Sequence, residues 1–433
     1  MPKGSFPLEV YQHCFSEMEY QFDVVVCGAG PAGASASLFL SQQGIRHLVF
    51  DLSAFPRPKV CGDGITPLCT TMLKQVIPDV LQDFEHKKQV KRIKKLRLYS
   101  VNFKHTELNT GDFIPDEKNN VYTISRFEFD NYLVKHLRQK PEATFWENTK
   151  LTGYTMEPEG VRLKLLKDGC PIEVFTKMVI AADGDRSPFR KSIYSTAIDR
   201  KQMVAAVRTY YRNVTPVSTN DLYEIYALKE VLPGYFWIFP MADGTHNVGL
   251  GITSDVIQEN KINLRKLMED LIATHPLLKA RFAHAEKTHS IEGSGLPIMM
   301  ETKPRLSDAR VVLTGDAASL ADPISGEGIG PGIVSGKYAA LIASEAIKAN
   351  DFSAAFLRRY DGYIHQKITQ AYEIRIKLFD WFLKKPKRIN ALVWAAPKLG
   401  WVRNFLANAA NGHVGVKDLK KFSLLKKFFM KKA

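Results

Sequence analysis

The order of apolar and polar residues predicts a strand–helix–strand unit near the start of the chain. Residues 23–27 are a short β-branched run that stops at a glycine, which is typical of a buried strand. Residues 32–43 have the composition of a helix, and they are followed by Gly44, a residue type that commonly ends helices. Residues 47–50 are apolar again and predict a second strand. A unit of this kind is the usual framework of a nucleotide-binding site.

The rest of the chain predicts a sheet-rich middle, a second nucleotide-type segment and a helical end. We expect strands within 92–101, 143–184 and 200–255, a helix within 123–140, a strand–loop–helix over 309–347, and helices over about the last 85 residues. The length agrees with this division, because 433 residues exceed what one simple core holds and predict two or three domains.

Positive charge is concentrated at two places in a chain whose formal net charge is +15. Residues 87–97 carry seven lysines and arginines, which we interpret as solvated surface. Residues 413–433 carry seven lysines and one aspartate, with apolar residues at near-helical spacing between them. This tail suits a helix on an anionic membrane surface or one docked on the protein's own body, and both interpretations stay open. Sequence motifs of nucleic-acid-binding proteins are absent, so no nucleic-acid partner is expected.

The cysteines argue against a metal centre. They stand at Cys14, Cys27, Cys61, Cys69 and Cys170, and no two have the close spacing that zinc sites and iron–sulfur clusters need. We therefore expect no metal. The odd number of cysteines and the lack of a secretion-type start predict a cytoplasmic protein in a reducing setting. No run reaches the roughly 18 apolar residues of a membrane span, so any membrane association is expected to be peripheral.

A glycine-rich turn follows the first predicted strand and opens the first predicted helix. Its pattern is Gly28-x-Gly30-x-x-Gly33, and Asp51 ends the second strand 18 residues later. Gly28 permits a tight turn, Gly30 lets a pyrophosphate approach the backbone, and Gly33 allows close packing of helix on strand. The diphosphate then meets the positive end of the helix, and the Asp51 carboxylate can bind ribose hydroxyls. These features predict a bound dinucleotide.

A second pair of turns favours FAD over NAD. Gly315 and Asp316 follow the apolar run 311–313, and a stretch with four glycines, 326–332, precedes a helix. The aspartate can bind a ribityl hydroxyl, and the backbone amides of the later turn can face the edge of a flavin ring. Two glycine-rich turns so far apart in sequence suit a cofactor larger than one dinucleotide half.

These segments together predict an α/β fold with interleaved domains. A Rossmann-type FAD-binding domain is expected to alternate along the chain with an antiparallel-sheet substrate domain, and a helical C-terminal region is expected to follow. The expected segments are 20–75, 115–190 and 295–345 for the FAD-binding domain, 76–114 and 191–294 for the substrate domain, and 346–433 for the helical region with its basic amphipathic tail.

The motifs as a set resemble those of the FAD-dependent geranylgeranyl reductases, within the superfamily of p-hydroxybenzoate-hydroxylase-like flavoproteins. The resemblance covers residues 20–345 and begins with the dinucleotide turn. The other matching residues are Asp183, Gly184, Ser187 and Arg190 for an internal D-G-x-x-S-x-x-R element, Gly315 and Asp316 for a G-D element, and Arg126 for an arginine near the flavin diphosphate.

Two further elements narrow the resemblance to the reductases. They are P-R-x-K-x-C-G at Pro56, Arg57, Lys59, Cys61 and Gly62, and Y-x-W-x-F-P at Tyr235, Trp237, Phe239 and Pro240. The resemblance implies that the first element approaches the flavin, with Cys61 as a proton donor or a tuning group, and that the second forms a wall against an isoprenoid chain. From the residues alone, Cys61 packing in a turn and the three aromatics forming ordinary core stay open as alternatives.

The resemblance implies an FAD-dependent oxidoreductase that reduces C=C bonds of a polyprenyl lipid or quinone side chain by hydride transfer from reduced flavin. The electron donor is open between NADPH and ferredoxin. The expected catalytic residues are Cys61, Tyr235 and Trp237. The expected substrate-binding residues are Tyr235, Trp237, Phe239 and Pro240. The expected FAD-binding residues are Gly28, Gly30, Pro31, Ala32, Gly33, Asp51, Lys59, Cys61, Gly62, Arg126, Asp183, Gly315, Asp316, Gly328 and Ile329.

Other flavoproteins share part of this pattern. A flavin monooxygenase that hydroxylates an aromatic ring has the same FAD motifs but gives no role to Cys61 or to the aromatic element. A flavin halogenase carries W-x-W-x-I-P where this chain has Y-x-W-x-F-P. An electron-transfer dehydrogenase with an iron–sulfur cluster is excluded by the cysteine spacing. A non-catalytic lipid- or quinone-binding flavoprotein is the alternative from a different class.

Overall fold

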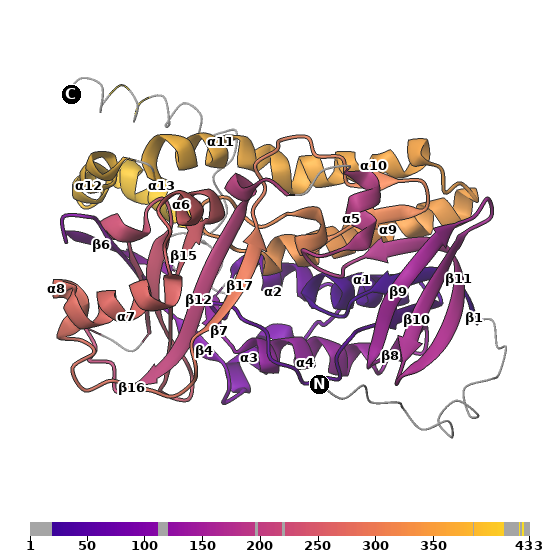
Figure 1. The fold of residues 1–433 in the computed structure, drawn as a ribbon, viewed down its shortest axis with the longest axis horizontal. Helices are drawn as coiled ribbons and strands as arrows, with labels where there is room; N and C mark the ends of the chain where they lie inside the picture. Colours follow the sequence, from indigo (N-terminus) through magenta and orange to yellow (C-terminus); the bar gives the residue numbers. More distant parts are fainter. Residues whose placement is uncertain are drawn as a thin grey trace.

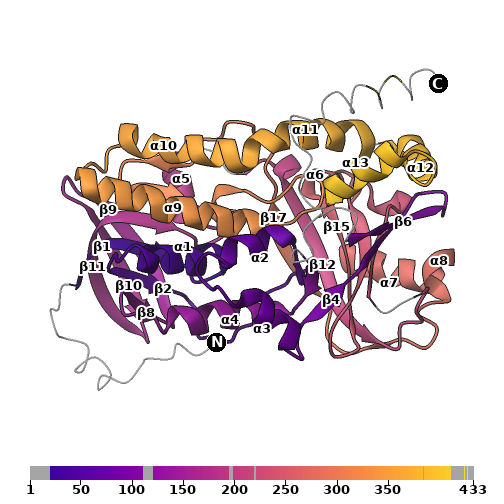
Figure 2. The ribbon, with the colours of Figure 1, turned by 180° about the vertical axis from the view of Figure 1, so that it is seen from behind.

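The computed structural model places two large β-sheets at opposite ends of an elongated molecule, with helices between them and along one side (Figure 1; Figure 2 gives the view from behind). The described residues are 20–110, 120–194, 198–218, 221–383 and 385–410, together with Leu424 and Lys427. The N-terminal strand belongs to one sheet, and the chain passes to the other sheet and back before it ends in helices.

The first sheet is built around the buried strand β1 (Tyr20–Cys27), whose last four residues are fully buried. It lies parallel to β2 on one side and β11 on the other, and β11 pairs in turn with β19. The strand order is β18-β19-β11-β1-β2-β8, and β9 and β10 continue from β11 as an antiparallel extension. The remaining bounds are β2 (His47–Phe50), β8 (Ala143–Trp146), β9 (Thr149–Met156), β10 (Val161–Lys167), β11 (Cys170–Ala181), β18 (Ser307–Asp308) and β19 (Val311–Leu313).

Helices α1 (Pro31–Gln42) and α9 (Ile329–Ala349) pack closely beside this sheet. Gly336 of α9 makes the close approach possible, since a Cβ atom there would lie 2.3 Å from the Ala32 carbonyl oxygen. Helix α4 (Arg126–Leu137) contacts α1 as well. The helix expected within 123–140 is present, and it begins at Arg126 because the Ser125 side chain accepts the Glu128 amide and caps the helix there.

The second sheet is antiparallel apart from one parallel pair, β5 with β13. Its strand order is β16-β12-β15-β14-β13-β5-β6, with β17 also paired to β12. Its core includes Val248, Leu250 and Ile252, which are completely buried. The bounds are β5 (Lys95–Tyr99), β6 (His105–Asn109), β12 (Met203–Arg212), β13 (Leu222–Tyr226), β14 (Tyr235–Pro240), β15 (His246–Thr253), β16 (Glu286–Lys287) and β17 (Glu292–Pro297). Beside it lie α6 (Ser254–Glu259), α7 (Leu264–Thr274) and α8 (Pro276–Lys279).

A small third sheet joins the two halves. Its three strands have the order β3-β7-β4, and the nearby helix α3 inserts Phe84 among Tyr122, Phe129 and Tyr132. Helix α3 therefore packs on the nucleotide-type half rather than on the second sheet. The bounds are β3 (Gly64–Ile65), β4 (Lys91–Ile93), β7 (Val121–Thr123), α2 (Pro67–Leu73), α3 (Val80–His86) and α5 (Pro188–Ile193).

The C-terminal helices run along one side of the molecule and contact both halves (Figure 1). The Tyr360 hydroxyl donates to the Leu313 carbonyl, and the Tyr372 hydroxyl donates to the Leu320 carbonyl. The fully buried Arg375 forms an ion pair with Asp322. The bounds are α10 (Ala354–Ile364), a π-helical turn over His365–Thr369, α11 (Gln370–Leu378), a second π-helical turn over Phe379–Leu383, α12 (Pro386–Ala395) and α13 (Gly400–Ala410).

The expected fold class is confirmed: an α/β nucleotide-binding half, a mainly antiparallel sheet and a helical C-terminal region are all present. Within the described ranges no helix is long and apolar enough to cross a membrane. Of the basic tail 413–433, only Leu424 and Lys427 are described, and both are exposed. Among the described residues, Cys27, Cys61 and Cys69 are free thiols.

Candidate functional site

The first glycine-rich turn is so closely packed that two of its glycines have no room for a side chain. Gly28 has φ +95°, and its amide donates to the Phe50 carbonyl over 2.7 Å. A Cβ atom on Gly28 would lie 2.5 Å from the Ala182 carbonyl oxygen, and one on Gly33 would lie 1.8 Å from the Gly28 carbonyl oxygen. The turn therefore has the predicted shape, and its close packing explains why positions 28 and 33 are glycines.

Gly30, the middle glycine of the turn, has room beside it. A Cβ atom on Gly30 would meet only the Arg57 guanidinium, at 3.6 Å. Helix α1 begins just after it with Pro31, which has no amide hydrogen to leave unpaired. The open space at Gly30 and the positive end of the helix dipole suit an anionic group such as a pyrophosphate.

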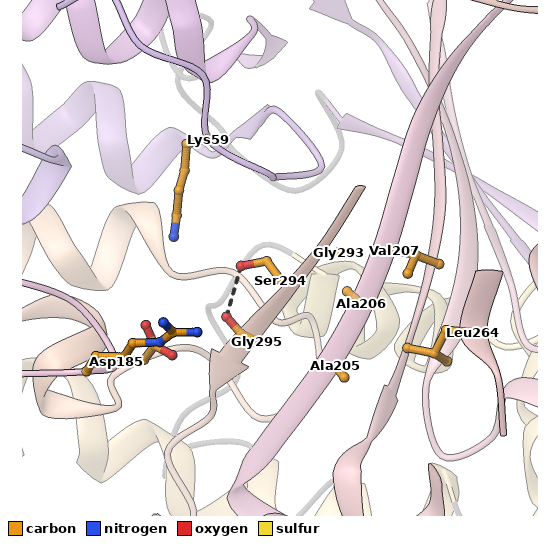
Figure 3. A pocket seen from close by; sticks show the side chains of 10 residues that line it. Lys59, Asp185, Ala205, Ala206, Val207, Leu264, Gly293, Ser294 and Gly295 are labelled. Atoms are coloured by element: carbon orange, nitrogen blue, oxygen red, sulfur yellow. Dashed lines mark hydrogen bonds between the residues drawn. The ribbon is translucent and has the colours of Figure 1, made fainter. Parts of the chain in front are cut away.

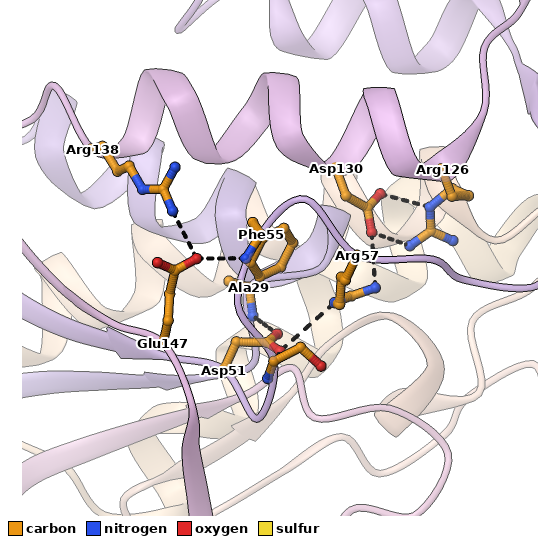
Figure 4. A network of polar contacts seen from close by, with 9 residues as sticks. Ala29, Asp51, Phe55, Arg57, Arg126, Asp130, Arg138 and Glu147 are labelled. Carbon is orange, nitrogen blue, oxygen red and sulfur yellow. Dashed lines mark hydrogen bonds and ion pairs between the residues drawn. The ribbon is translucent and has the colours of Figure 1, made fainter. Parts of the chain in front are cut away.

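Asp51 lies at the end of β2, where the sequence predicts it, but it also has a structural role. One of its carboxyl oxygens accepts the Ala29 amide at 2.8 Å, and the other accepts the Ser53 amide at 2.9 Å. Arg57 lies 3.7 Å from the same carboxylate and 3.3 Å from Asp130 (Figure 4). The acid thus fixes the turn while keeping lone pairs that can accept ribose hydroxyls.

Arg126 and Asp130 continue this polar network along α4 (Figure 4). The Arg126 guanidinium donates twice to the Asp130 carboxylate, at 2.6 and 2.7 Å, and both side chains are buried. Arg126 also lies beside Cys61 and acts electrostatically on Asp316. Sequence reasoning did not single out Asp130. An acid four residues after a buried arginine on one helix face was the available signal.

The later glycine-rich segments converge on the first turn. Gly315 has φ +55°, and a Cβ atom there would lie 3.0 Å from the Ala32 Cβ. A Cβ atom on Gly328 would lie 3.5 Å from an Asp316 carboxyl oxygen. Segments nearly 300 residues apart in sequence therefore meet at one end of the first sheet, as a dinucleotide that spans both turns requires.

Two acids at this end of the sheet are arranged to meet polar groups of a ligand. Burial raises the pKa of Asp316, and the nearby Lys59 opposes this rise. Burial also raises the pKa of Asp183, to about 6, and neither of its carboxyl oxygens is in hydrogen-bonding geometry with a described donor. Together with the open backbone at Gly30, these groups fit FAD.

Cys61 is partly exposed and lies between the two halves of the molecule. Burial raises the pKa of its thiol, while the Arg126 guanidinium and the Asp63 amide oppose the rise. The net direction is upward, so the sulfur carries a proton at neutral pH. This protonation state is the one that a proton donor needs.

The three aromatic residues of the predicted substrate wall share one face of β14. The Trp237 ring lies 5.9 Å from the Tyr235 ring and 6.2 Å from the Phe239 ring, measured between centroids. Gly62 is next to this face, since a Cβ atom there would lie 3.5 Å from Phe239 and 3.9 Å from Trp237. The Cys61 segment therefore lies directly against the aromatic face, which brings together the two elements that carried the resemblance.

The same strand contacts the later glycine-rich loop. The Tyr235 hydroxyl donates to the Ser325 carbonyl at 2.5 Å. Opposite Trp237, the neighbouring strand carries Gly249, where a Cβ atom would lie 2.3 Å from the indole ring. Because Gly249 has no side chain, the indole ring of Trp237 fits in this space. Pro240 ends the strand, and its carbonyl accepts the Thr123 hydroxyl at 2.6 Å.

A cavity of about 570 Å³ opens between the two halves beside this site (Figure 3). Lys59 extends into it from the segment that precedes Cys61, and Asp185 and Arg186 line it from the same half. The opposite wall is made of small residues of β12 and β17, including Gly293 and Gly295. Among the described residues no cluster of acids, histidines or cysteines could hold a metal ion.

Besides Asp130, three residues of the site were not found by sequence reasoning: Asp63, Tyr210 and Asn247. Asp63 is completely buried and accepts the Tyr210 hydroxyl at 2.5 Å and the Asn247 side-chain amide at 2.8 Å. These contacts join positions 147 and 184 residues apart, so no local spacing reveals them. The available signal was an acid directly inside a glycine-rich segment next to the cysteine.

The fold and the site define a flavoprotein of the dinucleotide-binding class, in which an aromatic face of a second sheet lies against the Cys61–Gly62 segment. A family model described as the FAD binding domain matches residues 21–357, which is most of the chain. The chain belongs to this FAD-binding-domain family, and it is an FAD-dependent oxidoreductase.

Curated relatives confirm the expected resemblance. A digeranylgeranylglycerophospholipid reductase of Thermoplasma volcanium is 28% identical over 376 residues, which cover 84% of this chain and 87% of the relative. A menaquinone reductase of Mycobacterium tuberculosis is 28% identical over 342 residues, which cover 78% of this chain and 80% of the relative. Both relatives are thus similar to this chain over most of their length.

Solved structures agree with this assignment. A geranylgeranyl bacteriochlorophyll reductase-like protein from Thermoplasma acidophilum superposes with a TM-score of 0.77 at 25% identity, over 93% of this chain and all of the other. A flavin-dependent brominase superposes with a TM-score of 0.72 at 18% identity, over 95% of this chain and 99% of the other, which is a likeness of fold alone.

Proposed function

We propose that this protein reduces carbon–carbon double bonds of a polyprenyl chain carried by a lipid or a quinone. The observation that carries the proposal is the contact between the Cys61–Gly62 segment and the aromatic face of Tyr235, Trp237 and Phe239. A thiol beside a continuous apolar face suits an alkene, which needs apolar contact along its chain and a proton at one carbon. The printed activities of the relatives support this substrate class.

FAD, when bound, supplies the hydride, and the chain's own residues do the rest. We expect the turn at Gly28–Gly33 to hold the diphosphate, with Asp51 on the ribose and with Asp183 and Asp316 on further polar groups. The aromatic face orients the prenyl chain and excludes water from it. Cys61 holds a proton at its sulfur, because its raised thiol pKa keeps it protonated at neutral pH.

Anaerobic turnover separates this function from its alternatives. FAD-loaded protein is reduced chemically, mixed with a geranylgeranyl lipid or with menaquinone in detergent, and the products are analysed by mass spectrometry. The expected result is a product two mass units heavier per reduced bond without oxygen. A product that forms only with oxygen would indicate a monooxygenase, and a halide-dependent product would indicate a halogenase. Tight lipid binding without any product would indicate a non-catalytic carrier.

For the electron donor, we infer a phosphate-bearing nicotinamide nucleotide such as NADPH rather than ferredoxin. The cavity in Figure 3 supports this inference, because Lys59 and Arg186 outnumber the single carboxylate of Asp185 in its lining and the glycines of β17 leave space beside them. Stopped-flow reduction of the bound flavin by NADPH should be fast and should slow in an Arg186→Ser variant. Reduction by ferredoxin alone would contradict the inference.

For the membrane, we propose that the basic tail 413–433 binds an anionic bilayer surface. Its lysines alternate with apolar residues, and the described Leu424 is 57% exposed. Removing the tail should leave FAD content unchanged and abolish co-sedimentation with phosphatidylglycerol vesicles. High salt should weaken binding by the full chain, because the attraction is screened over about a Debye length. Unchanged binding by the truncated protein would assign the tail to the protein's own body.

A further inference from the structure

Asp63 lies at the boundary between the two halves and has no exposed surface. Its backbone has φ +64°, a left-handed conformation that aspartate and asparagine tolerate better than most residues do. Its carbonyl accepts the Ile124 amide at 3.1 Å, and one carboxyl oxygen accepts the Arg126 amide at 3.2 Å. The nucleotide-binding half therefore fixes Asp63 through its backbone and one of its oxygens.

The other carboxyl oxygen belongs to the second sheet. It accepts the Tyr210 hydroxyl of β12 at 2.5 Å and the Asn247 side-chain amide of β15 at 2.8 Å. A single buried carboxylate thus receives donors from both halves. Buried carboxylates are costly unless hydrogen bonds of this kind compensate them, so the arrangement is specific to an acceptor-only group.

Asn247 extends this contact to both proposed catalytic elements. Its amide nitrogen also donates to the Cys61 carbonyl at 2.8 Å, and its amide oxygen accepts the Trp237 indole N–H at 2.9 Å. The orientation of the amide is determined by these partners, since the nitrogen faces two acceptors and the oxygen faces a donor. Asp63, through Asn247, therefore connects the Cys61 backbone to the Trp237 ring.

We propose that Asp63 is a positioning residue, whose carboxylate holds the Cys61 segment and the Trp237 ring in one fixed arrangement across the boundary between the two halves. The proposal rests on the proposed function, because it gives Cys61 and Trp237 their roles. It adds the residue on which their relative placement depends. Asp63 need not touch the substrate for this purpose.

The carboxylate also affects the Cys61 sulfur, which provides a readout that loss of packing alone would not give. The groups that face the thiol are Arg126, Asp63, Tyr210, Tyr223 and Tyr235. Burial raises the pKa of Asp63 itself, while its hydrogen bonds from Tyr210 and Asn247 and the Arg208 charge oppose that rise. The ionised Asp63 carboxylate raises the pKa of the thiol, and the Arg126 guanidinium lowers it. Removing the Asp63 charge should therefore make the thiol easier to deprotonate.

Two matched variants of the FAD-loaded protein test the proposal. Asp63→Asn keeps the shape and tolerates the left-handed backbone but removes the charge, and Tyr210→Phe removes one donor while the charge stays. Alkylation of Cys61 by iodoacetamide is followed from pH 7 to 9 by mass spectrometry. The fully buried Cys27 and Cys69 report on any general loosening, because they should stay unlabelled. Turnover of the prenyl substrate is measured on the same samples.

Alkylation of Cys61 at pH 8 should rise several-fold in Asp63→Asn and should not rise in Tyr210→Phe. Turnover should fall about tenfold in Asp63→Asn and less in Tyr210→Phe, with FAD content unchanged in both. Parental alkylation and turnover in Asp63→Asn would overturn the proposal, and so would an equal rise in both variants with labelling of Cys27 or Cys69. If the parent protein reduced no prenyl substrate, the proposed function would fail, while the alkylation result would still decide whether Asp63 controls Cys61.

Discussion

The glycine-rich turn at Gly28–Gly33 and the segment around Cys61 contribute to the same site but are held in different ways. The hydrogen bonds that shape the turn lie within the first strand–helix–strand unit, such as the bond from the Ala29 amide to Asp51, 22 residues away, and Ala182 packs against the turn from outside this unit. The Cys61 segment is fixed by donors that come from the other sheet, 147 and 184 residues from Asp63. The shape of the turn thus depends mostly on nearby sequence, whereas the placement of the Cys61 segment depends on how the two halves of the molecule meet.

The largest expected effect comes from a substitution that disrupts the turn at Gly28–Gly33. Gly33→Ala places a Cβ atom 1.8 Å from the Gly28 carbonyl oxygen, so helix and strand must separate. We expect a loss of more than about 4 kcal/mol in the free energy of unfolding, or no folded protein. Gly30→Ala is the matched control, since its Cβ atom meets only Arg57 at 3.6 Å. It should stay folded but bind FAD more weakly, as followed by thermal unfolding and flavin titration. A stable, yellow Gly33→Ala protein would contradict this account.

A second prediction concerns long-range support of the site by the C-terminal helices. Arg375 is completely buried and paired with Asp322, whose carboxylate also accepts the Ile324 and Ser325 amides at 2.8 Å each. Arg375→Met should cost about 3–5 kcal/mol of stability, because it leaves a buried carboxylate without its cation. The double variant Asp322→Asn/Arg375→Met should recover part of this loss in urea unfolding. No recovery would mean that Arg375 acts through packing alone.

The same contrast explains what the sequence could predict. The turn, its acid and the later glycine-rich loops are short patterns with a known backbone purpose, so both their existence and their meeting point could be predicted. The approach of Cys61 to Trp237 could be expected only through the family resemblance, since the residues allowed ordinary packing as well. Asp63, Asn247 and Asp130 could not be assigned, because their roles depend on partners brought together by the tertiary fold.

A third, smaller effect compares two buried carboxylates. Asp63 accepts the Tyr210 hydroxyl at 2.5 Å, whereas the nearby Ser187 side chain and the Asp183 amide lie outside hydrogen-bonding geometry with the Asp183 carboxylate. Burial raises the pKa of Asp183 to about 6 in the folded protein, above its unfolded value. Its stabilising contribution is therefore complete below about pH 4 and is lost as the pH rises through about 6. Relative to Asp183→Asn, the parent should lose roughly 2–3 kcal/mol between pH 4 and 7 in urea unfolding. A difference that does not change with pH would indicate that Asp183 already has donors.

The smallest effect concerns the chemistry at the Cys61 segment rather than its placement. Cys61→Ser should retain the fold and the FAD content, because the two side chains are nearly the same size. Reduction of the prenyl substrate should nevertheless fall about tenfold, equivalent to about 1.4 kcal/mol of barrier, since a hydroxyl is a much weaker acid than a thiol. Reduction of the flavin by the electron donor should be unaffected, which separates the two half-reactions.

The pH dependence of the parent enzyme sharpens this last prediction. Because the pKa of the Cys61 thiol is raised, the sulfur keeps its proton as the pH passes the ordinary thiol range. Prenyl reduction should therefore stay constant through the ordinary thiol range and decline only above it. Asp63→Asn should move this decline to lower pH, and Cys61→Ser should remove it. A serine variant with parental turnover, or one that loses FAD, would make Cys61 a packing residue of the segment and leave the aromatic face as the remaining support for the proposed chemistry.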